Sequence, residues 1–465
     1  MRASVEGENS NSEHRSPDRP DTMVQIAFDP ADPKAALAQL PHAAAVYALY
    51  GAEAHQEPYI GRTPNLRSRL ERLLQPSPKH PRRLQLAGLV RRIEWRLTGS
   101  EFESLLLQFE LLQNQYGPKA PDESLKRMHL RNPAFIRYLG GNPYPRITVT
   151  HRPGQREAGW SYGPFASRAA AERFADEALK LFLLRRCTDD LAPDPSHPGC
   201  VYSEMKMCLA PCYKGCTDER YAEEAAAVEN FIATRGESRL VVLRAERDHA
   251  SATLAFESAA ALHAQVQKVE SVRALASELV RPLSQLRAVI LQASANPDEV
   301  AVFLFENSRL SGPAPFSTLG MRIQNEQSGS TSLFAQPMAL EPVPEKQGSE
   351  IREQGSEKTE DASAEQTAPL EAQLSHEAPV PIKIPRGMLE GRLEAALAAL
   401  AESSRPPSST ERQGHMALVK RWYYRPEARR TGEIFFPDAE GRWPIRSILR
   451  GAGRVAAKML ASADQ

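Results

Sequence analysis

Apolar and polar positions near the start of the chain follow the short period of strands and then the longer period of a helix. Strands are expected at residues 46–50 and 59–62, joined by the polar loop 51–58. Thr63 and Pro64 are typical of a helix start, because proline fits the first helical turn. The expected buried face of this helix consists of Leu66, Leu70, Leu73 and Leu74.

A third strand and a second amphipathic helix follow. The strand is expected at residues 91–97. Ser100 followed by Glu103 is a capping-box pattern, which predicts the start of a helix there. The apolar side of this helix comprises Leu105, Leu106, Leu111 and Leu112. Strand, strand, helix, strand and helix together predict a small α/β domain at residues 40–122.

Helical patterns dominate the middle of the chain. Helices are expected at residues 168–186 and 217–234, and residues 238–279 are helix-forming and contain neither glycine nor proline. Strands are expected at 287–294 and 299–305, with Asn307 and Ser308 at a hairpin turn.

These patterns predict an α/β multidomain protein. Residues 1–22 are a polar tail, and residues 324–380 are rich in Glu, Gln, Ser and Pro, so both are expected to be disordered. The remaining predicted parts are a cysteine-cluster helical domain at 140–236, a helical hairpin at 238–279, a short β segment at 285–323 and a small α+β module at 385–461.

The composition is ordinary for a soluble globular protein. Its 465 residues are 41% hydrophobic and 25% charged, and the formal net charge is zero. The apolar runs are too short for a membrane span, and the polar first 22 residues lack the apolar core of a signal peptide. We therefore expect a cytoplasmic protein with no membrane partner.

All five cysteines lie between residues 187 and 216. Four of them, Cys187, Cys200, Cys208 and Cys212, are separated by 13, 8 and 4 positions. Clustered cysteines inside a cell are typical of metal ligands, and thiolates suit zinc or an iron–sulfur cluster. The spacing does not choose between the two, and reduced structural cysteines are the alternative. Cys216 is a fifth thiol, interpreted as free or as an alternate ligand.

Two stretches combine positive charge with features of nucleic-acid binding. Residues 62–96 include ten basic residues but only two acidic ones, Glu71 and Glu94. Such an excess of positive charge suits binding to a phosphate backbone, and the alternative is a basic surface exposed to solvent. The arginines expected to contact DNA are Arg67, Arg72, Arg82, Arg83, Arg91 and Arg92. Near the C-terminus, residues 421–425 interleave arginine with aromatic residues, a pattern of single-strand binding or of a packing module with a basic surface.

Several motifs carry a family resemblance. Ala45-Val46-Tyr47, Tyr59-Ile60-Gly61-Arg62 and Asn65-Leu66-Arg67-Ser68-Arg69 resemble the core of a GIY-YIG nuclease. The segments around Tyr144, around Tyr162 and around the cysteines resemble the UvrC family of excinucleases, which act in nucleotide excision repair. The resemblance implies an endonuclease that uses Mg²⁺ or Mn²⁺ to cut DNA. It assigns catalytic roles to Tyr47, Tyr59, Arg62 and Arg69.

The same resemblance implies a cofactor and a partner. It implies a [4Fe–4S] cluster on Cys187, Cys200, Cys208 and Cys212. Residues 252–260 resemble the UVR motif, a helical hairpin that docks on a UvrB-like helicase subunit, with a plain helical linker as the alternative. The partner-binding residues expected from this likeness are Leu254, Phe256, Glu257 and Ala260.

The chain departs from the family where the chemistry needs a carboxylate. The glutamate that holds the metal ion in the family is Gln108 here, and a neutral amide is a poor ligand for a hard divalent cation. Ala45 replaces a glycine, Arg62 replaces a lysine, and Ala120 or Pro121 stands where the family has an asparagine. We find no downstream strand with paired carboxylates, so we expect neither the second, RNase H-like nuclease nor the tandem helix-hairpin-helix region.

Three interpretations follow. The first is a UvrC-like DNA-binding protein whose nuclease domain is impaired by Gln108. The second is an active excinuclease subunit that makes one metal-dependent incision, with Mg²⁺ or Mn²⁺ held by Gln108 and waters or by another carboxylate. In the third, the chain is unrelated to DNA and the basic stripe is surface. Separately, the missing carboxylate leaves open that Tyr47 and Tyr59 are ordinary core tyrosines of the fold.

Overall fold

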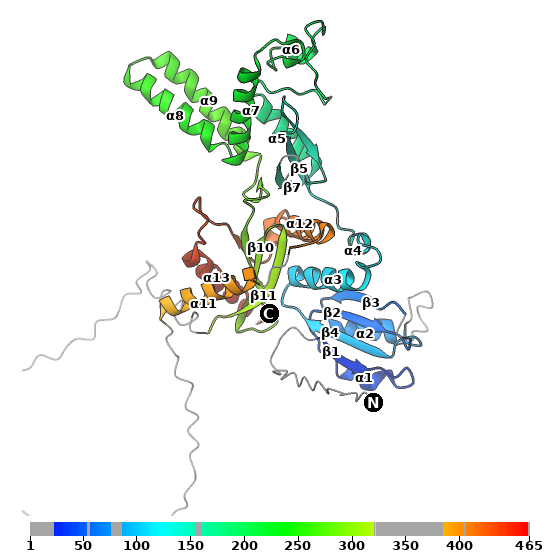
Figure 1. Ribbon diagram of the computed structural model, residues 1–465. Helices are drawn as coiled ribbons and strands as arrows, with labels where there is room; N and C mark the ends of the chain where they lie inside the picture. Colours follow the sequence, from blue (N-terminus) through cyan, green and yellow to red (C-terminus); the bar gives the residue numbers. More distant parts are fainter. Residues whose placement is uncertain are drawn as a thin grey trace, which may run out of the picture.

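The computed structural model describes residues 23–463 except 54–55, 76–85, 154–159, 189, 320, 322–384 and 403–405. Within these residues the fold is mixed α/β, with three four-stranded sheets in which every strand pairing is antiparallel. Figure 1 shows the N-terminal sheet and a projecting helical hairpin at opposite ends of the molecule, with the third sheet between them. The expected disorder of residues 1–22 and 324–380 concerns segments outside the described residues.

The N-terminal unit is a sheet covered by helices on both faces. Its strands, in the order β1-β4-β2-β3, are Val24–Ala27, Arg92–Leu97, Ala45–Tyr50 and Tyr59–Thr63. On one face, Tyr47 and Leu49 pack with α1 (Pro33–Ala38) and α2 (Leu66–Leu74). Helix α3 (Glu101–Tyr116) covers the other face, where Ile60 contacts its core, and α4 (Glu123–Arg127) follows.

The N-terminal unit differs from expectation in its boundaries. It starts before residue 40, because Val24 pairs with Trp95 at the edge of the sheet. The residue that caps α2 is Asn65, whose side chain accepts the Ser68 N–H at 3.0 Å, and not Thr63, which ends β3. The Thr63 hydroxyl instead donates to the Asn65 carbonyl at 3.0 Å.

The predicted capping of α3 is half realised. Ser100 accepts the Glu103 N–H at 3.1 Å, as the pattern indicates. The Glu103 carboxylate accepts the Gly99 N–H at 2.9 Å, one residue before the expected partner.

The middle unit joins a second sheet to helices. Its strands, in the order β6-β5-β7-β8, are Arg146–Thr150, Ala134–Leu139, Ser161–Phe165 and Arg281–Pro282. The helical segments are α5 (Arg168–Leu179), α6 (Val201–Glu204), a 3₁₀ turn at Pro211–Tyr213 and α7 (Asp218–Ala233). Helix α5 ends earlier than the predicted residue 186, because the following chain leaves the helix to bury Leu184 and to let Arg185 Nε donate to the Tyr144 carbonyl at 2.8 Å.

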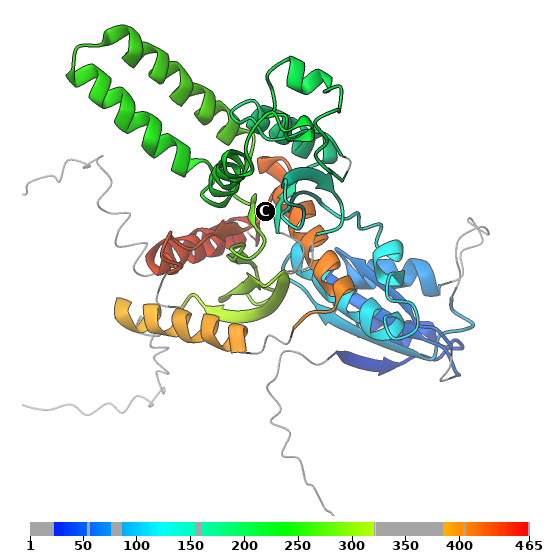
Figure 2. The ribbon, with the colours of Figure 1, turned by 45° about the horizontal axis from the view of Figure 1, so that its top comes forward.

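The helix-forming stretch after residue 236 is a hairpin of two helices, α8 (Glu237–Ala252) and α9 (Phe256–Ala274). It turns at Leu254, which takes a left-handed backbone with φ of 59°. Ion pairs of Arg244 with Glu270 at 2.8 Å and of Arg273 with Glu237 at 3.0 Å link the helices. The hairpin projects away from the rest of the chain in both ribbon views (Figures 1 and 2).

The third sheet is built from two ranges that the sequence separates. Strands β9 (Ala288–Ala293), β10 (Glu299–Glu306) and β11 (Arg309–Ser317) are joined by β12 (Glu433–Phe435), which pairs with β9 through Ile434 and Ile290. The hairpin turn predicted at Asn307 and Ser308 is present, and both residues have positive φ. The expected β segment at 285–323 and the C-terminal module at 385–461 therefore form one unit.

Three C-terminal helices cover both faces of this sheet. Helices α11 (Arg386–Glu402) and α13 (Ile445–Ala463) pack on the face that carries Leu291 and Val302. Helix α12 (Ser409–Tyr423) packs on the face that carries Ile290 and Phe303, and a 3₁₀ turn follows at Glu427–Arg429.

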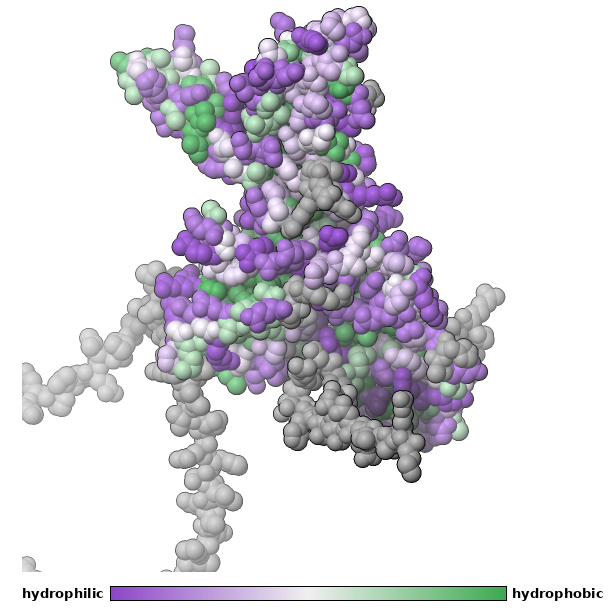
Figure 3. Space-filling model, in the orientation of Figure 1, coloured by the Kyte–Doolittle hydropathy of each residue, from purple (hydrophilic) through white to green (hydrophobic). Residues whose placement is uncertain are grey.

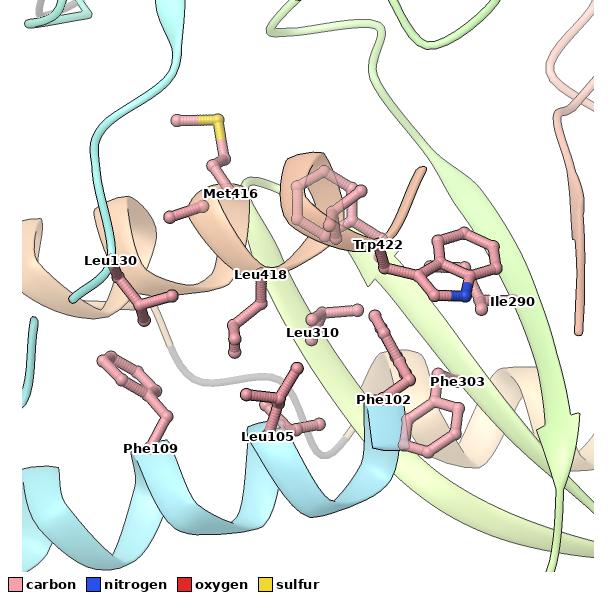
Figure 4. Packing of buried hydrophobic residues seen from close by; sticks show 14 of the residues in the cluster. Phe102, Leu105, Phe109, Leu130, Ile290, Phe303, Leu310, Met416, Leu418 and Trp422 are labelled. Carbon is pink, nitrogen blue, oxygen red and sulfur yellow. The ribbon is translucent and has the colours of Figure 1, made fainter. Parts of the chain in front are cut away.

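Helix α12 also joins the third sheet to the N-terminal unit. It runs beside α3 in both ribbon views (Figures 1 and 2). Figure 4 shows Phe102, Leu105 and Phe109 of α3 pointing toward Leu418 and Trp422 of α12, with Phe303 at the end of the row. The Phe102 ring lies 5.4 Å from the Trp422 ring and 5.2 Å from the Phe303 ring. One apolar core therefore holds α3 against the C-terminal part of the chain. Among the described helices, none has the length and apolar content to cross a membrane.

Candidate nuclease-like site and cysteine cluster

Three of the residues that the motif assigns to catalysis meet on one face of the N-terminal sheet. Tyr47 of β2 is 1% exposed, and its hydroxyl accepts a long hydrogen bond from Arg69 Nε at 3.4 Å. Its ring lies 6.2 Å from the ring of Tyr59 on β3. Two strands and helix α2 therefore bring together Tyr47, Tyr59 and Arg69.

Gly61 makes room for this arrangement. It lies opposite Tyr47 in the register of β2 and β3. A Cβ atom added to Gly61 would lie 2.7 Å from the Tyr47 hydroxyl oxygen and 2.8 Å from Cζ, closer than van der Waals contact allows. The glycine of the second motif thus allows the Tyr47 ring to lie against the strand.

Burial decides the protonation of Tyr47. Removal from water raises the pKa of the phenol, and the nearby Tyr59 adds to the rise, while the hydrogen bond from Arg69 partly opposes it. A phenol with a raised pKa stays neutral near pH 7. In this environment Tyr47 can orient a water through a hydrogen bond, but it is a weak base.

Gln108 and Tyr59 line one open cavity of about 360 Å³. Glu57, Tyr116 and Arg127 line the same cavity. Gln108 is half-buried on α3 and presents a neutral amide where the motif calls for a carboxylate. The replacement of glutamate by Gln108 therefore lies in the same cavity as the motif residue Tyr59.

Sequence reasoning missed the carboxylate that this cavity does contain. Glu57 lies in the loop before β3, and its carboxylate pairs with Arg127 Nη2 at 3.2 Å and accepts a hydrogen bond from the Tyr116 hydroxyl at 3.3 Å. Its position two residues before Tyr59 was a usable signal. Arg127 comes from α4 and its ring partner Tyr116 from the end of α3, so only the tertiary structure places them here.

Arg62 lies apart from Tyr47 and Arg69. Successive side chains of a strand point to opposite faces, so Arg62 faces α3 while Gly61 faces Tyr47. Its guanidinium lies 3.5 Å from the Glu101 carboxylate at the start of α3. The four predicted catalytic residues are therefore split between the two faces of the sheet.

The predicted DNA-binding arginines have different environments. Arg67 donates from Nε to the Leu40 carbonyl at 2.8 Å and from Nη2 to the Ala38 carbonyl, so it fastens the end of α1. Arg92 pairs with Glu94 at 3.2 Å and lies over the Tyr50 ring. Arg72 and Arg91 are exposed and donate to neighbouring carbonyls. Arg82 and Arg83 lie outside the described residues.

The four predicted cluster cysteines lie near one another. Burial, the largest cause, and the proximity of Cys187, Cys200 and Cys212 together raise the pKa of Cys208 to about 11, although the hydrogen bond from the Ala210 N–H opposes the rise. The Ala210 N–H donates to Cys208 Sγ at 3.3 Å, and Arg185 Nη1 donates to Cys187 Sγ at 3.4 Å. Donors of this kind stabilise thiolates, so the chemistry of the set fits zinc or an iron–sulfur cluster.

The residue types of the cysteine set suit a metal site, but the positions of the side chains do not form one. No three His, Cys, Asp or Glu side chains of the described residues are arranged to hold a metal ion. The fifth thiol, Cys216, lies beside Asp218, whose charge adds to burial in raising the thiol pKa. The cluster thus stays a prediction about four named residues.

The tip of the hairpin exposes apolar side chains. Leu254 is 71% exposed and Phe256 is 66% exposed, and Glu257 and Ala260 are also exposed. Figure 3 shows apolar surface on this hairpin. The four residues expected to bind a partner are accessible in the described chain.

Comparison with known proteins identifies two segments. Residues 43–119 match the family of the UvrC-like GIY-YIG domain, and residues 135–231 match the middle domain of the UvrC/Cho excinuclease. No solved structure matches the chain.

Curated relatives are similar over the same part of the chain. The chain is 31% identical to UvrABC system protein C of Alcanivorax borkumensis over 243 residues, which is 52% of this chain and 39% of the relative. The protein of that name from Aliivibrio salmonicida is 30% identical over 52% of this chain and 39% of the relative. The protein of that name from Ruminiclostridium cellulolyticum is 28% identical over 64% of this chain and 48% of the relative.

The chain thus spans between two fifths and half of the length of these relatives. The two family matches cover the tyrosine site and the cysteine segment separately, and they agree with the motifs in both. The chain therefore contains a segment at residues 43–119 that matches the UvrC-like GIY-YIG domain, followed by a segment at residues 135–231 that matches the UvrC/Cho middle domain.

Proposed function

We propose that the chain is a DNA-binding protein of nucleotide excision repair whose nuclease-like domain holds DNA without cutting it. The observation that carries this proposal is the neutral Gln108 beside Tyr59 in the open cavity. Metal-dependent phosphodiester cleavage needs a divalent cation at the scissile phosphate, and such cations prefer carboxylate ligands. With an amide there and a neutral Tyr47, the domain retains cations that attract phosphates but lacks the ligand that fixes a metal ion.

The alternative is an active excinuclease subunit that makes a single incision near damage. Glu57 favours it, since this carboxylate lines the same cavity as Gln108 and Tyr59. Its ion pair with Arg127 and its bond from Tyr116 argue against it, because a metal ion would have to displace both partners. If Mg²⁺ or Mn²⁺ binds, Glu57 and Gln108 are the residues of this cavity that would hold it, and the ion would polarise the scissile phosphate.

The four cysteines support a cofactor in the middle domain. We propose that Cys187, Cys200, Cys208 and Cys212 bind a [4Fe–4S] cluster, with zinc as the alternative. Iron–sulfur binding predicts a brown protein with visible absorbance after purification without oxygen. Stoichiometric zinc with no iron would contradict the cluster.

The exposed hairpin supports a protein partner. We propose that it docks a UvrB-like helicase subunit through Leu254 and Phe256, which keep apolar area in water unless a partner covers it. Leu254→Ser with Phe256→Ser should abolish co-elution with that subunit and leave the thermal unfolding temperature unchanged. Undiminished binding by this double variant would contradict the assignment.

A combined binding and nicking assay tests the proposed function. It uses a lesion-bearing duplex, the helicase subunit and Mg²⁺ or Mn²⁺, and it compares the natural chain with Gln108→Glu, Tyr47→Phe and Glu57→Gln. We expect the natural chain to bind and leave both strands intact, and Gln108→Glu to gain nicking that Tyr47→Phe removes. Nicking by the natural chain that is lost in Tyr47→Phe and Glu57→Gln would establish the active alternative instead.

A further inference from the structure

Two arginines from distant parts of the sequence meet at one carboxylate. Glu101 opens α3, and its two oxygens accept from Arg425 Nη1 at 2.7 Å and Nη2 at 2.8 Å. Arg62 of β3 approaches the same carboxylate at 3.5 Å. A residue that follows α12 thus binds the same carboxylate as Arg62 of the GIY-YIG motif.

A third arginine stands close to this pair. Arg421, in the last turn of α12, is exposed. Burial lowers the pKa of Arg62; Glu101 opposes this, and the positive charges of Arg421 and Arg425 lower it further. Three guanidinium groups therefore share the field of one carboxylate, which leaves an excess of two positive charges.

The apolar core beneath these charges fixes their positions. Phe102, the residue after Glu101, packs against Trp422, the residue after Arg421. This contact holds the start of α3 against the end of α12 without help from the ion pairs, which are partly exposed and therefore contribute little to stability. Side chains of Arg62, Glu101 and Arg425 keep 31%, 41% and 25% of their surface in water.

We propose that Arg62, Arg421 and Arg425 form a composite binding site for the phosphate backbone of DNA, which extends the nuclease-like domain onto the C-terminal unit. The bidentate fork with which Arg425 holds Glu101 matches phosphate oxygens as well as carboxylate oxygens. In the free protein Glu101 aligns Arg62 and Arg425, and phosphates engage the excess positive charge. This inference rests on the proposed function, because it names the residues that hold the DNA.

Salt-dependent binding to a short fluorescein-labelled duplex, followed by anisotropy on the full chain, tests the proposal. The slope of log K against log salt is negative, and each lost phosphate contact reduces its magnitude by about 1. The double variant Arg421→Gln with Arg425→Gln should therefore reduce the magnitude of the slope by about 2. Affinity should fall on the order of 10-fold at moderate salt. Arg412→Gln is the matched control, since Arg412 is exposed on α12 about 13 Å along the helix from Arg421, and it should leave the slope unchanged.

Glu101→Gln separates phosphate contact from loss of docking. It breaks the same ion pairs but removes a negative charge, so DNA should bind as tightly as to the natural chain or more tightly. If Glu101→Gln weakens binding as much as the double variant, the arginines act only by joining the two units, and the proposal is wrong. An unchanged slope in the double variant would also overturn it while leaving DNA binding intact, whereas absence of binding by the natural chain would overturn the proposed function as well.

Discussion

The two halves of helix α3 have opposite environments on their polar side. At its start, Glu101 is a carboxylate engaged by Arg62 and Arg425. Two turns later, Gln108 is a neutral amide that faces an open cavity beside Tyr59. On its apolar side the helix packs against α12 from Phe102 to Phe109 (Figure 4).

This difference indicates what the helix does in this chain. The end that joins the N-terminal unit to the C-terminal unit keeps both its charge and its packing, whereas the position that lines the open cavity has a side chain that binds divalent cations poorly. The helix is therefore well suited to hold two units together and poorly suited to hold a metal ion.

The largest expected effect is a loss of stability on changing the apolar side of α3. Phe102→Ala removes a buried ring that contacts both Trp422 and Phe303, so the free energy of unfolding should fall by about 3 to 5 kcal/mol. Urea unfolding followed by circular dichroism measures the loss. A change under about 1 kcal/mol would show that α12 does not pack on α3 in solution.

A smaller loss is expected where Gly414 of α12 lies against Phe109 of α3. A Cβ on Gly414 of α12 would lie 2.1 Å from Cζ of the buried Phe109 ring, so Gly414→Ala should destabilise the chain by about 1 to 3 kcal/mol. Gly391→Ala is the matched control, because a Cβ there meets nothing within 4 Å and alanine favours a helix. Equal stability of the two variants would contradict the close packing.

A still smaller effect should depend on pH. Burial raises the pKa of Tyr47, so its neutral form stabilises the folded state below pH 10, and this contribution is lost as the pH rises above 10. Tyr47→Phe should therefore lose less stability than the natural chain between neutral and alkaline pH. A parallel decline of both proteins would mean that Tyr47 ionises as freely as in the unfolded chain.

The smallest effect is expected at Glu101. Its ion pairs are partly exposed, so Glu101→Gln should change the free energy of unfolding by less than about 1 kcal/mol. Added salt should reduce the difference further. A loss as large as that of Phe102→Ala would show that charge, and not apolar packing, joins the two units.

Local patterns predicted much of the N-terminal unit and the helices of the middle unit, but the middle unit was expected to be helical and its sheet of β5 to β8 was not predicted. The strands around Tyr47 and Tyr59 and the Ser100 cap follow from residue types and spacing, because each depends on neighbours in the sequence. The meeting of Tyr47 with Arg69 was expected only through the motif. The pairing of Arg425 with Glu101 was not predictable, because it depends on how α12 packs although residues 324–380, which are rich in Glu, Gln, Ser and Pro, separate it from the rest of the chain.

The structure also adds contacts that the sequence did not predict. The predicted DNA contact of Arg67 stays a prediction, and in the structure Arg67 also donates to carbonyls at and just after the end of α1. Strand β12 was not predicted, because its three residues are too few to show a strand pattern. Its hydrogen-bonded pairing with β9 makes it a strand. Partners that are distant in the sequence therefore decide the structure of a segment whose local pattern allows several structures.

Binding of Mn²⁺ to the full chain, followed by the loss of the free-ion signal in electron paramagnetic resonance, tests the central claim most directly. The natural chain and Tyr47→Phe should leave the signal of free Mn²⁺ unchanged, and Gln108→Glu should bind one ion. Binding of one Mn²⁺ by the natural chain that disappears in Glu57→Gln would contradict the account, since the cavity would then hold a metal ion without a carboxylate at position 108.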